Sequence, residues 1–126
     1  DSVASRGLGD VYKRQVLTAM IGAAKADGHI GPEERALLET EMGKLSSDAQ
    51  DRRWLEAELA RPLDPAAIAQ SAKTPEMAAE MYLASLLVVD EESYMERAYL
   101  DELARRLQLQ PGLKEQLEQH ARAAVA

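Results

Sequence analysis

Proline divides this chain at intervals and restricts where its helices can begin. Four of its five prolines, Pro32, Pro65, Pro75 and Pro111, lie where they suit the first turn of a helix. Proline is tolerated there because its missing N–H has no partner inside the helix, whereas further along it breaks the hydrogen-bond ladder. We therefore expect a series of separate helices, each begun anew.

Apolar residues between these positions recur with the period of a helix. Leu17, Met20, Ile21 and Ala24 follow the i, i+3, i+4, i+7 spacing of one helix face. The same spacing continues along the chain, and no stretch keeps the apolar–polar alternation of a strand. We predict an all-α fold of about seven helices, which begin near Val16, Pro32, Ser47, Pro65, Glu76, Ser93 and Pro111.

The fifth predicted helix, residues 76–90, is apolar around most of its circumference. A helix of this kind is usually enclosed by others, so we place it at the centre of the fold. Its apolar run, residues 81–89, is much shorter than the roughly 18 residues that a bilayer span needs. We therefore predict a buried central helix and no membrane-spanning segment in this chain.

Composition narrows the functional classes. A length of 126 residues suits one domain with a core, and 46% hydrophobic residues argue against disorder. The net charge of −7 argues against nucleic acid, because binding a polyanion depends on an excess of Lys and Arg. An acidic surface instead suits cations or basic partners. The lack of cysteine excludes disulfides and thiolate metal sites.

Residues 1–15 differ from the rest of the chain. They have no helical period, contain two glycines, and carry three basic residues at the front of an acidic chain. Residues 9–15 resemble translated adapter sequence, so we interpret residues 1–15 as a foreign segment, with a natural disordered extension as the alternative. The helical domain is predicted over residues 16–126.

A helix–acidic hinge–helix unit occurs twice. In residues 24–34, Gly28 suits the left-handed residue that ends a helix, and Pro32 suits the start of the next. In residues 89–96, Ser93 and Glu96 form a capping box.

The two units also align residue by residue. Asp27 matches Asp90, and residues 34–39 match residues 96–101. We predict two repeats related by pseudo-two-fold symmetry around the buried central helix.

Both hinges carry residues that resemble a known bacterial family. Residues 23–30 read Ala-Ala-Lys-Ala-Asp-Gly-His-Ile and residues 96–100 read Glu-Arg-Ala-Tyr-Leu, with further matches at residues 19–21, 33–34, 84–87 and 90. This combination, within residues 16–119, resembles the YebE-like family of unknown function, which is related to the TerB domain of tellurite resistance.

The resemblance has implications beyond the fold. It implies an all-helical TerB-like domain from a Gram-negative bacterium, with metal binding through acidic residues at the hinges. It also implies a role in stress-linked, membrane-associated complexes, with a cytoplasmic location at the inner membrane in the full-length protein. Family members often carry a Gly/Ala-rich apolar region before this domain, and no such region precedes residue 16 here.

The first hinge matches the second half of an EF-hand calcium loop. Asp27, Gly28, Ile30 and Glu34 have the spacing of that half. The two earlier ligand positions hold Ala23 and Lys25, which excludes a complete EF-hand.

Acids from both hinges together are the candidate metal ligands. Oxygen ligands favour Ca²⁺ or Mg²⁺ over zinc, and the two histidines lack zinc-site spacing. The alternative is that these acids only cap helices and complement their dipoles. The proposed set of carboxylate ligands, or of residues that orient them, is Asp27, Glu34, Asp90 and Glu96.

No nucleophile–base pair can be assigned from the sequence, and we expect a non-enzymatic protein. The first hypothesis is a TerB-like helical module that senses a divalent cation or acts as a scaffold, with a membrane-associated protein partner. The alternative is a metal-independent interaction domain, whose acidic face docks a basic or membrane-bound partner.

Overall fold

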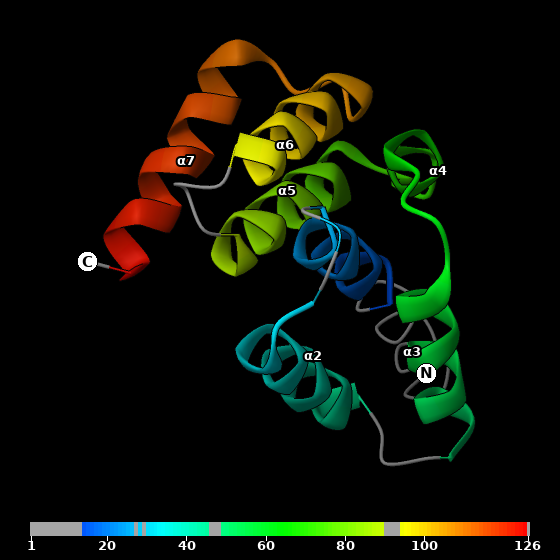
Figure 1. Ribbon diagram of the computed structural model, residues 1–126. Coiled ribbons are helices and arrows are strands. Elements are labelled where there is room, and N and C mark those ends of the chain that lie inside the picture. The colour runs from blue at the N-terminus through cyan, green and yellow to red at the C-terminus, as the bar shows by residue number, and fades with distance from the viewer. Residues whose placement is uncertain (1–13, 27, 29, 46–48, 90–93, 126) are drawn as a thin grey trace, which may run out of the picture.

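The computed structural model describes residues 14–26, 28, 30–45, 49–89 and 94–125 (Figure 1). The first helix covers residues 14–24. It is followed by α2 (Pro32–Leu45), α3 (Ala49–Ala60), α4 (Pro65–Gln70), α5 (Pro75–Val88), α6 (Tyr94–Arg106) and α7 (Pro111–Val125). The predicted all-α fold of seven helices is confirmed, with no strand in these ranges.

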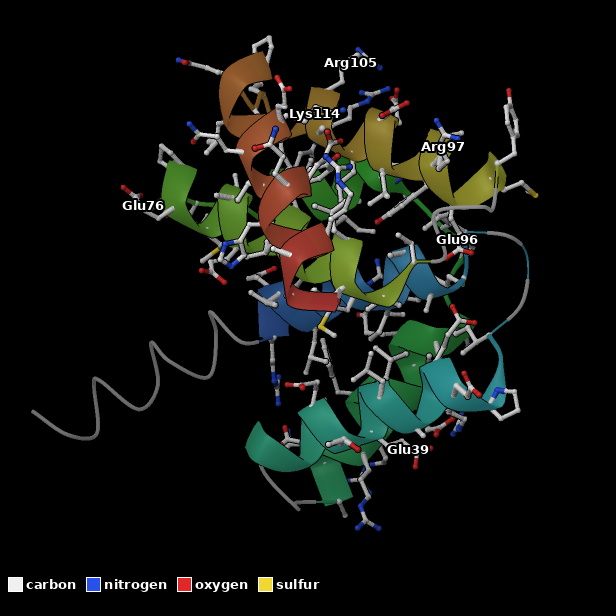
Figure 2. The ribbon with its side chains drawn as sticks, turned by 90° about the vertical axis from the view of Figure 1, so that its left-hand side faces the viewer. Glu39, Glu76, Glu96, Arg97, Arg105 and Lys114 are labelled. Carbon is white, nitrogen blue, oxygen red and sulfur yellow. The ribbon has the colours of Figure 1, made fainter. Side chains whose placement is uncertain are left out.

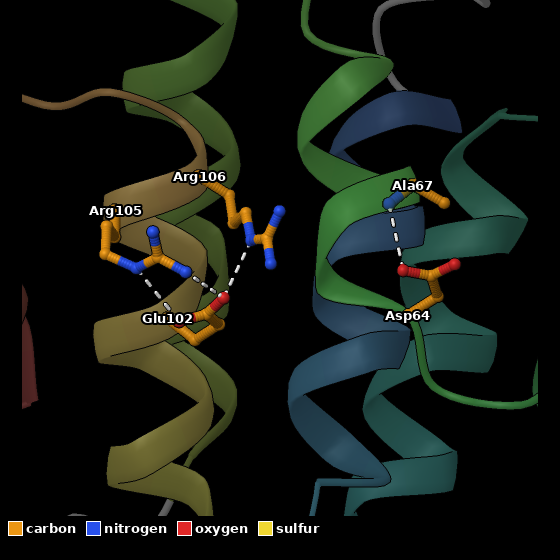
Figure 3. A network of polar contacts seen from close by, with 5 residues as sticks. All are labelled: Asp64, Ala67, Glu102, Arg105 and Arg106. Carbon is orange, nitrogen blue, oxygen red and sulfur yellow. Dashed lines mark hydrogen bonds and ion pairs between the residues drawn. The ribbon is translucent and has the colours of Figure 1, made fainter.

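The helix-starting role of four prolines is confirmed, since α2, α4, α5 and α7 each begin at one. Two of these helices also carry a capping side chain. Asp64 Oδ1 accepts a hydrogen bond from the N–H of Ala67 at 3.2 Å, as Figure 3 shows. Thr74 Oγ1 accepts one from the N–H of Met77 at 3.0 Å. Such caps satisfy N–H groups that have no partner within the helix.

Two apolar cores share the first helix. Ala19 and Ala23 of this helix belong to a core with α4, α5 and α6. Met20 and Ile21 belong to a second core with α2 and α3. Figure 1 shows the first helix between α2 and α3 on one side and α4–α7 on the other. Every residue from 19 to 24 is buried, because this helix has packing partners all around it.

The fifth helix, α5, occupies the central position in the larger core. Met81 and Tyr82 are 0% exposed, and Ser85 Oγ donates to the backbone carbonyls of Met81 and Ala19 at 2.8 and 3.2 Å. The hydroxyl thereby joins α5 to the first helix. At its C-terminal end α5 reaches the surface, where Leu87 is 48% exposed. The first helix is therefore enclosed more completely than α5.

The first helix also approaches α6 closely at Gly22. A Cβ at this position would overlap the Tyr99 hydroxyl and lie 2.7 Å from Ile68 Cδ1. Tyr99 is 5% exposed, and its hydroxyl has no hydrogen-bond partner in the described part of the chain. Burial raises the pKa of this phenol. Glycine is thus required by the space available, since helix formation itself would favour alanine.

The last helix, α7, is attached through a polar contact with the core. Tyr82 Oη donates to Glu118 Oε2 at 2.8 Å, and Lys114 Nζ lies 2.9 Å from the same oxygen. Burial alone would raise the pKa of Glu118, but hydrogen bonds from Lys114 and Tyr82 outweigh it and lower this pKa. A charged Glu118 therefore holds α7 against α5.

Several predictions concern residues outside the described ranges. Ser47, near which the third helix was predicted to begin, and Ser93, the predicted capping residue of α6, are among them, as are residues 1–13. Arg14 and Gln15 already belong to the first helix, which therefore extends before the predicted domain boundary at residue 16. Arg14 pairs with Asp51 and lies 5.3 Å from the ring centroid of Trp54, which ties the first helix to α3.

Candidate functional site

The first hinge ends one helix and starts the next in the predicted way. Gly28 has a φ of +99°, in the left-handed region, and its N–H donates to the carbonyl of Lys25 at 3.1 Å. Glu34 lies in the first turn of α2, where its Oε1 accepts a hydrogen bond from the N–H of Gly31 at 3.0 Å. Glu34 thus has a capping contact, whereas the candidate ligand Asp27 lies outside the described residues.

The second hinge leads from α5 into α6. Its candidate ligand Asp90 lies outside the described residues. Glu96 occupies the first turn of α6 and is 4% exposed, which makes it the one buried charged side chain of the described residues. Figure 2 shows Glu96 at the end of the molecule where the chain passes from the first helix into α2. Glu96 is engaged in an interaction there, and is not a free carboxylate.

The four predicted ligands are therefore tested only in part. Glu34 and Glu96 both lie in first turns, where a carboxylate complements the helix dipole. Within the described ranges no three Asp, Glu or His side chains gather as a metal site. Carboxylate oxygens suit Ca²⁺ or Mg²⁺, and a complete ligand set at this end requires Asp27 and Asp90.

A cleft of about 430 Å³ lies between the first helix and the α3–α4 connection, and it was not predicted from the sequence. Lys25 lies on its wall and donates from Nζ to the carbonyls of Glu58 and Arg61, each at 2.7 Å. These are carbonyls at the C-terminal end of α3, which a lysine can cap. Burial lowers the pKa of Lys25, the nearby Glu58 opposing this. Lys25 therefore connects the first hinge to α3.

A second cleft, of about 950 Å³, lies where the α4–α5 and α6–α7 connections meet. Its charged lining residues are Lys73, Arg105 and Arg106, and no acid lines it. We call it the cationic cleft. Neither this cleft nor its charge was predicted from the sequence, since Lys73 of the α4–α5 connection and the two arginines of α6 meet only in the folded chain.

Glu102 holds the two arginines of this cleft. Its Oε2 lies 2.6 Å from Arg105 Nη2 and 2.7 Å from Arg106 Nε, as Figure 3 shows. These hydrogen bonds, first from Arg105 and then from Arg106, lower the pKa of Glu102 to about 2. One carboxylate thus faces two guanidinium groups, and one positive charge of the trio remains uncompensated.

Comparisons with known proteins cover most of the chain. Residues 5–121 match the family model described as "Protein of unknown function (DUF533)". The chain is also similar to a Yersinia enterocolitica protein described as "Uncharacterized protein in ampR 5'region". The two are 32% identical over 113 residues, which cover 90% of this chain and 81% of the relative. No solved structure matches the chain. None of the described helices is long and apolar enough to cross a bilayer.

Proposed function

This chain belongs to the DUF533 family of proteins of unknown function, and we propose that it is a non-enzymatic helical binding module. In this proposal the module binds a divalent cation at the end formed by its two hinges. Its resemblance to TerB-like and YebE-like proteins supports a place in a bacterial stress-response or envelope-associated system.

The burial of Glu96 is the observation that supports this proposal best. A carboxylate is rarely buried as fully as that of Glu96, which is 4% exposed and is already engaged in an interaction at this end. The carboxylate lies at the end of the molecule where the first hinge also lies (Figure 2). Buried negative charge at a junction of two acidic hinges suits a hard cation with oxygen ligands. Asp27 and Asp90 are the further ligands in this proposal, and Glu34 orients them or joins them.

Calorimetric titration of the metal-stripped protein with Ca²⁺, Mg²⁺, Mn²⁺ and Zn²⁺ tests the proposal. We expect saturable binding of Ca²⁺ or Mg²⁺, and its loss in an Asp27→Asn/Asp90→Asn variant. A Glu80→Gln/Glu115→Gln variant is the matched control, because it makes the same charge change at exposed positions on α5 and α7. A cation at about 100 times its Kd should also raise the free energy of unfolding by about 2.7 kcal/mol.

The contact of Glu34 favours a second candidate function. Because its Oε1 already accepts the N–H of Gly31, a capping role explains this acid without a metal. The module would then bind a basic partner through the acidic surface of α2, where Glu33 and Glu39 are exposed. Absence of cation binding, or binding that the Asp27→Asn/Asp90→Asn variant retains, would reject the metal site. Salt-sensitive binding of a lysine-rich peptide, weakened by Glu33→Gln/Glu39→Gln, would support this second function.

A further inference from the structure

The cationic cleft is separate from the hinge end. The helix α6 begins at the hinge end and finishes at this cleft, and its 13 residues span about 20 Å. The cleft volume of about 950 Å³ is at the upper end of the range for ligand sites. It is therefore large enough for an extended organic ligand, and much larger than a single ion needs.

The charge of the cleft is opposite to that of the whole chain. Lys73, Arg105 and Arg106 line it, and only Glu102 offsets them directly, which leaves two positive charges. Lys73 is exposed and forms no ion pair within the described part of the chain. Glu76, in the first turn of α5, projects outward away from α6 (Figure 2). The chain as a whole carries −7, so this is a local positive site on an acidic protein.

The guanidinium of Arg106 is well placed for a carboxylate. Glu102 contacts its Nε atom, and this is the one contact of Arg106 in the described part of the chain. The two Nη groups are therefore available for paired hydrogen bonds, the geometry in which arginine binds carboxylates most strongly.

Apolar residues also line the cleft. Four alanines from α4, α5 and their connection line the cleft, and Leu113 of α7 is 37% exposed beside it. Alanine side chains leave room for a ligand backbone to approach, and Leu113 offers apolar area that binding would bury. The cleft therefore suits a ligand that carries both negative charges and apolar groups.

Gln108 adds an unusual backbone conformation at the rim. Its φ is 60°, in the left-handed region, at the position after α6 where glycine is the usual residue. The N–H groups of Gln108 and Leu109 donate to the carbonyls of Arg105 and Ala104 at 3.1 and 3.2 Å, which closes the helix. The turn that closes α6 thus leaves the exposed amide of Gln108 at the rim of the cleft, within reach of a bound ligand.

We propose that the cationic cleft binds an acidic peptide segment of a partner protein. The carboxylates of the segment would contact Lys73 and Arg106, and its apolar side chains would pack on Leu113 and on the alanines that line the cleft. Nucleic acid is disfavoured by the net charge of −7. A flat lipid surface fits a concave site poorly. A short acidic and apolar peptide meets both the charge and the shape.

Fluorescence anisotropy with labelled peptides tests the proposal on the full chain. The probe is a peptide of glutamate and leucine, compared with a lysine–leucine peptide and a glutamate–serine peptide of the same length. We expect the glutamate–leucine peptide to bind best, because it alone supplies both kinds of contact. Binding should weaken at high salt, since exposed charges are screened.

Two matched variants separate the cleft from general charge effects. A Lys73→Gln/Arg106→Gln variant should weaken binding of the glutamate–leucine peptide about tenfold. An Arg52→Gln/Arg53→Gln variant makes the same change of net charge at exposed positions on α3, and should leave binding unchanged. Equal weakening by both variants would overturn the proposal, because it would show attraction to the whole surface alone.

Gln108→Gly gives a readout that a purely structural role would not. Glycine should raise the urea midpoint of unfolding while it lowers peptide affinity at least twofold, since it relieves the backbone but removes the amide. Unchanged peptide affinity in Gln108→Gly would show that the amide of Gln108 does not contact the peptide. Failure of the glutamate–leucine peptide to bind would overturn the whole proposal. So would binding to phosphatidylglycerol vesicles but not to this peptide.

Discussion

Gly22 provides the most direct test of how the first helix packs against α4 and α6. In Gly22→Ala, the new methyl group would overlap the Tyr99 hydroxyl and approach Ile68 Cδ1 to 2.7 Å. Neither neighbour can easily move, because Tyr99 is 5% and Ile68 8% exposed. The substitution therefore adds volume to a place where the first helix, α4 and α6 are already in contact.

The size of the effect follows from two opposing contributions. Overpacking of a core costs about 1–3 kcal/mol, and contact with two buried groups places Gly22→Ala near the upper end of this range. Alanine in place of a helical glycine stabilises by about 1 kcal/mol. We expect a net loss of about 2 kcal/mol in the free energy of unfolding. This corresponds to a Tm lower by about 8 °C for a domain of this size.

Urea unfolding followed by the circular dichroism of the helices measures this loss. Gly43→Ala is the matched control, because Gly43 is an exposed residue of α2 with no atom within 4 Å of the added Cβ. This control should stabilise the protein by about 0.5–1 kcal/mol. The two glycine substitutions should thus have opposite signs.

Tyr99→Phe identifies the atom responsible. Because its hydroxyl is buried without a partner in the described residues, its removal alone should be neutral or stabilise by up to about 1 kcal/mol. In the double variant, Tyr99→Phe should recover about half of the loss from Gly22→Ala, since the Ile68 contact remains. A Gly22→Ala protein as stable as the Gly43→Ala protein would refute this reasoning. So would strict additivity of the two substitutions.

Substitutions at four further residues probe other contacts, each measured by the same urea unfolding. Tyr82→Phe should cost about 1 kcal/mol, because Glu118 loses a half-buried hydrogen bond; an unchanged stability would mean that this contact does not hold α7. Lys25→Met keeps the apolar stem but loses two bonds to α3, and should cost about 1 kcal/mol; a smaller loss than in Lys73→Met would contradict the capping role. Thr74→Ala should cost about 1 kcal/mol as a lost N-cap, and Thr74→Ser should restore most of it. Folding lowers the pKa of Glu102 from 4.5 to about 2. Its contribution to the free energy of unfolding is therefore present above about pH 4.5 and is lost as the pH falls towards 2. If Glu102→Gln changed the free energy of unfolding by the same amount at pH 7 and at pH 2, this prediction would be wrong.

The order of helices could be predicted because it depends on local chemistry. Pro75 indicated the start of α5, and Gly28 indicated the end of the first helix through its left-handed backbone. These signals act within one turn of a helix, so they can be recognised in the sequence without knowledge of the fold. The enclosure of the first helix was not predicted. It depends on partners in both cores, and its alanines gave a weaker apolar signal than the leucines of α5.

The candidate site was predictable only as a set of residue types. The role of Glu34 at a helix start followed from its position after Pro32. The burial of Glu96 did not, since an acid in the first turn of a helix is usually exposed. The cationic cleft was not foreseen because Lys73 and Arg106 are 33 positions apart and share a site only through packing of α4 against α6. Pairings of this kind carry no local signature.

Sharing of the first helix between both cores affects how the chain folds during its synthesis. This helix is synthesised before α2–α7, yet the carbonyl of Ala19 is paired with the hydroxyl of Ser85, 66 residues later, and its core includes Leu103 and Leu107 of the α6 region. Its apolar sides therefore stay without their final partners until most of the chain has been made. Helical proteins usually rely on near neighbours and fold quickly. In this one, the first helix completes its packing only after α5 and α6 have been made, so the growing chain keeps apolar surface exposed for longer.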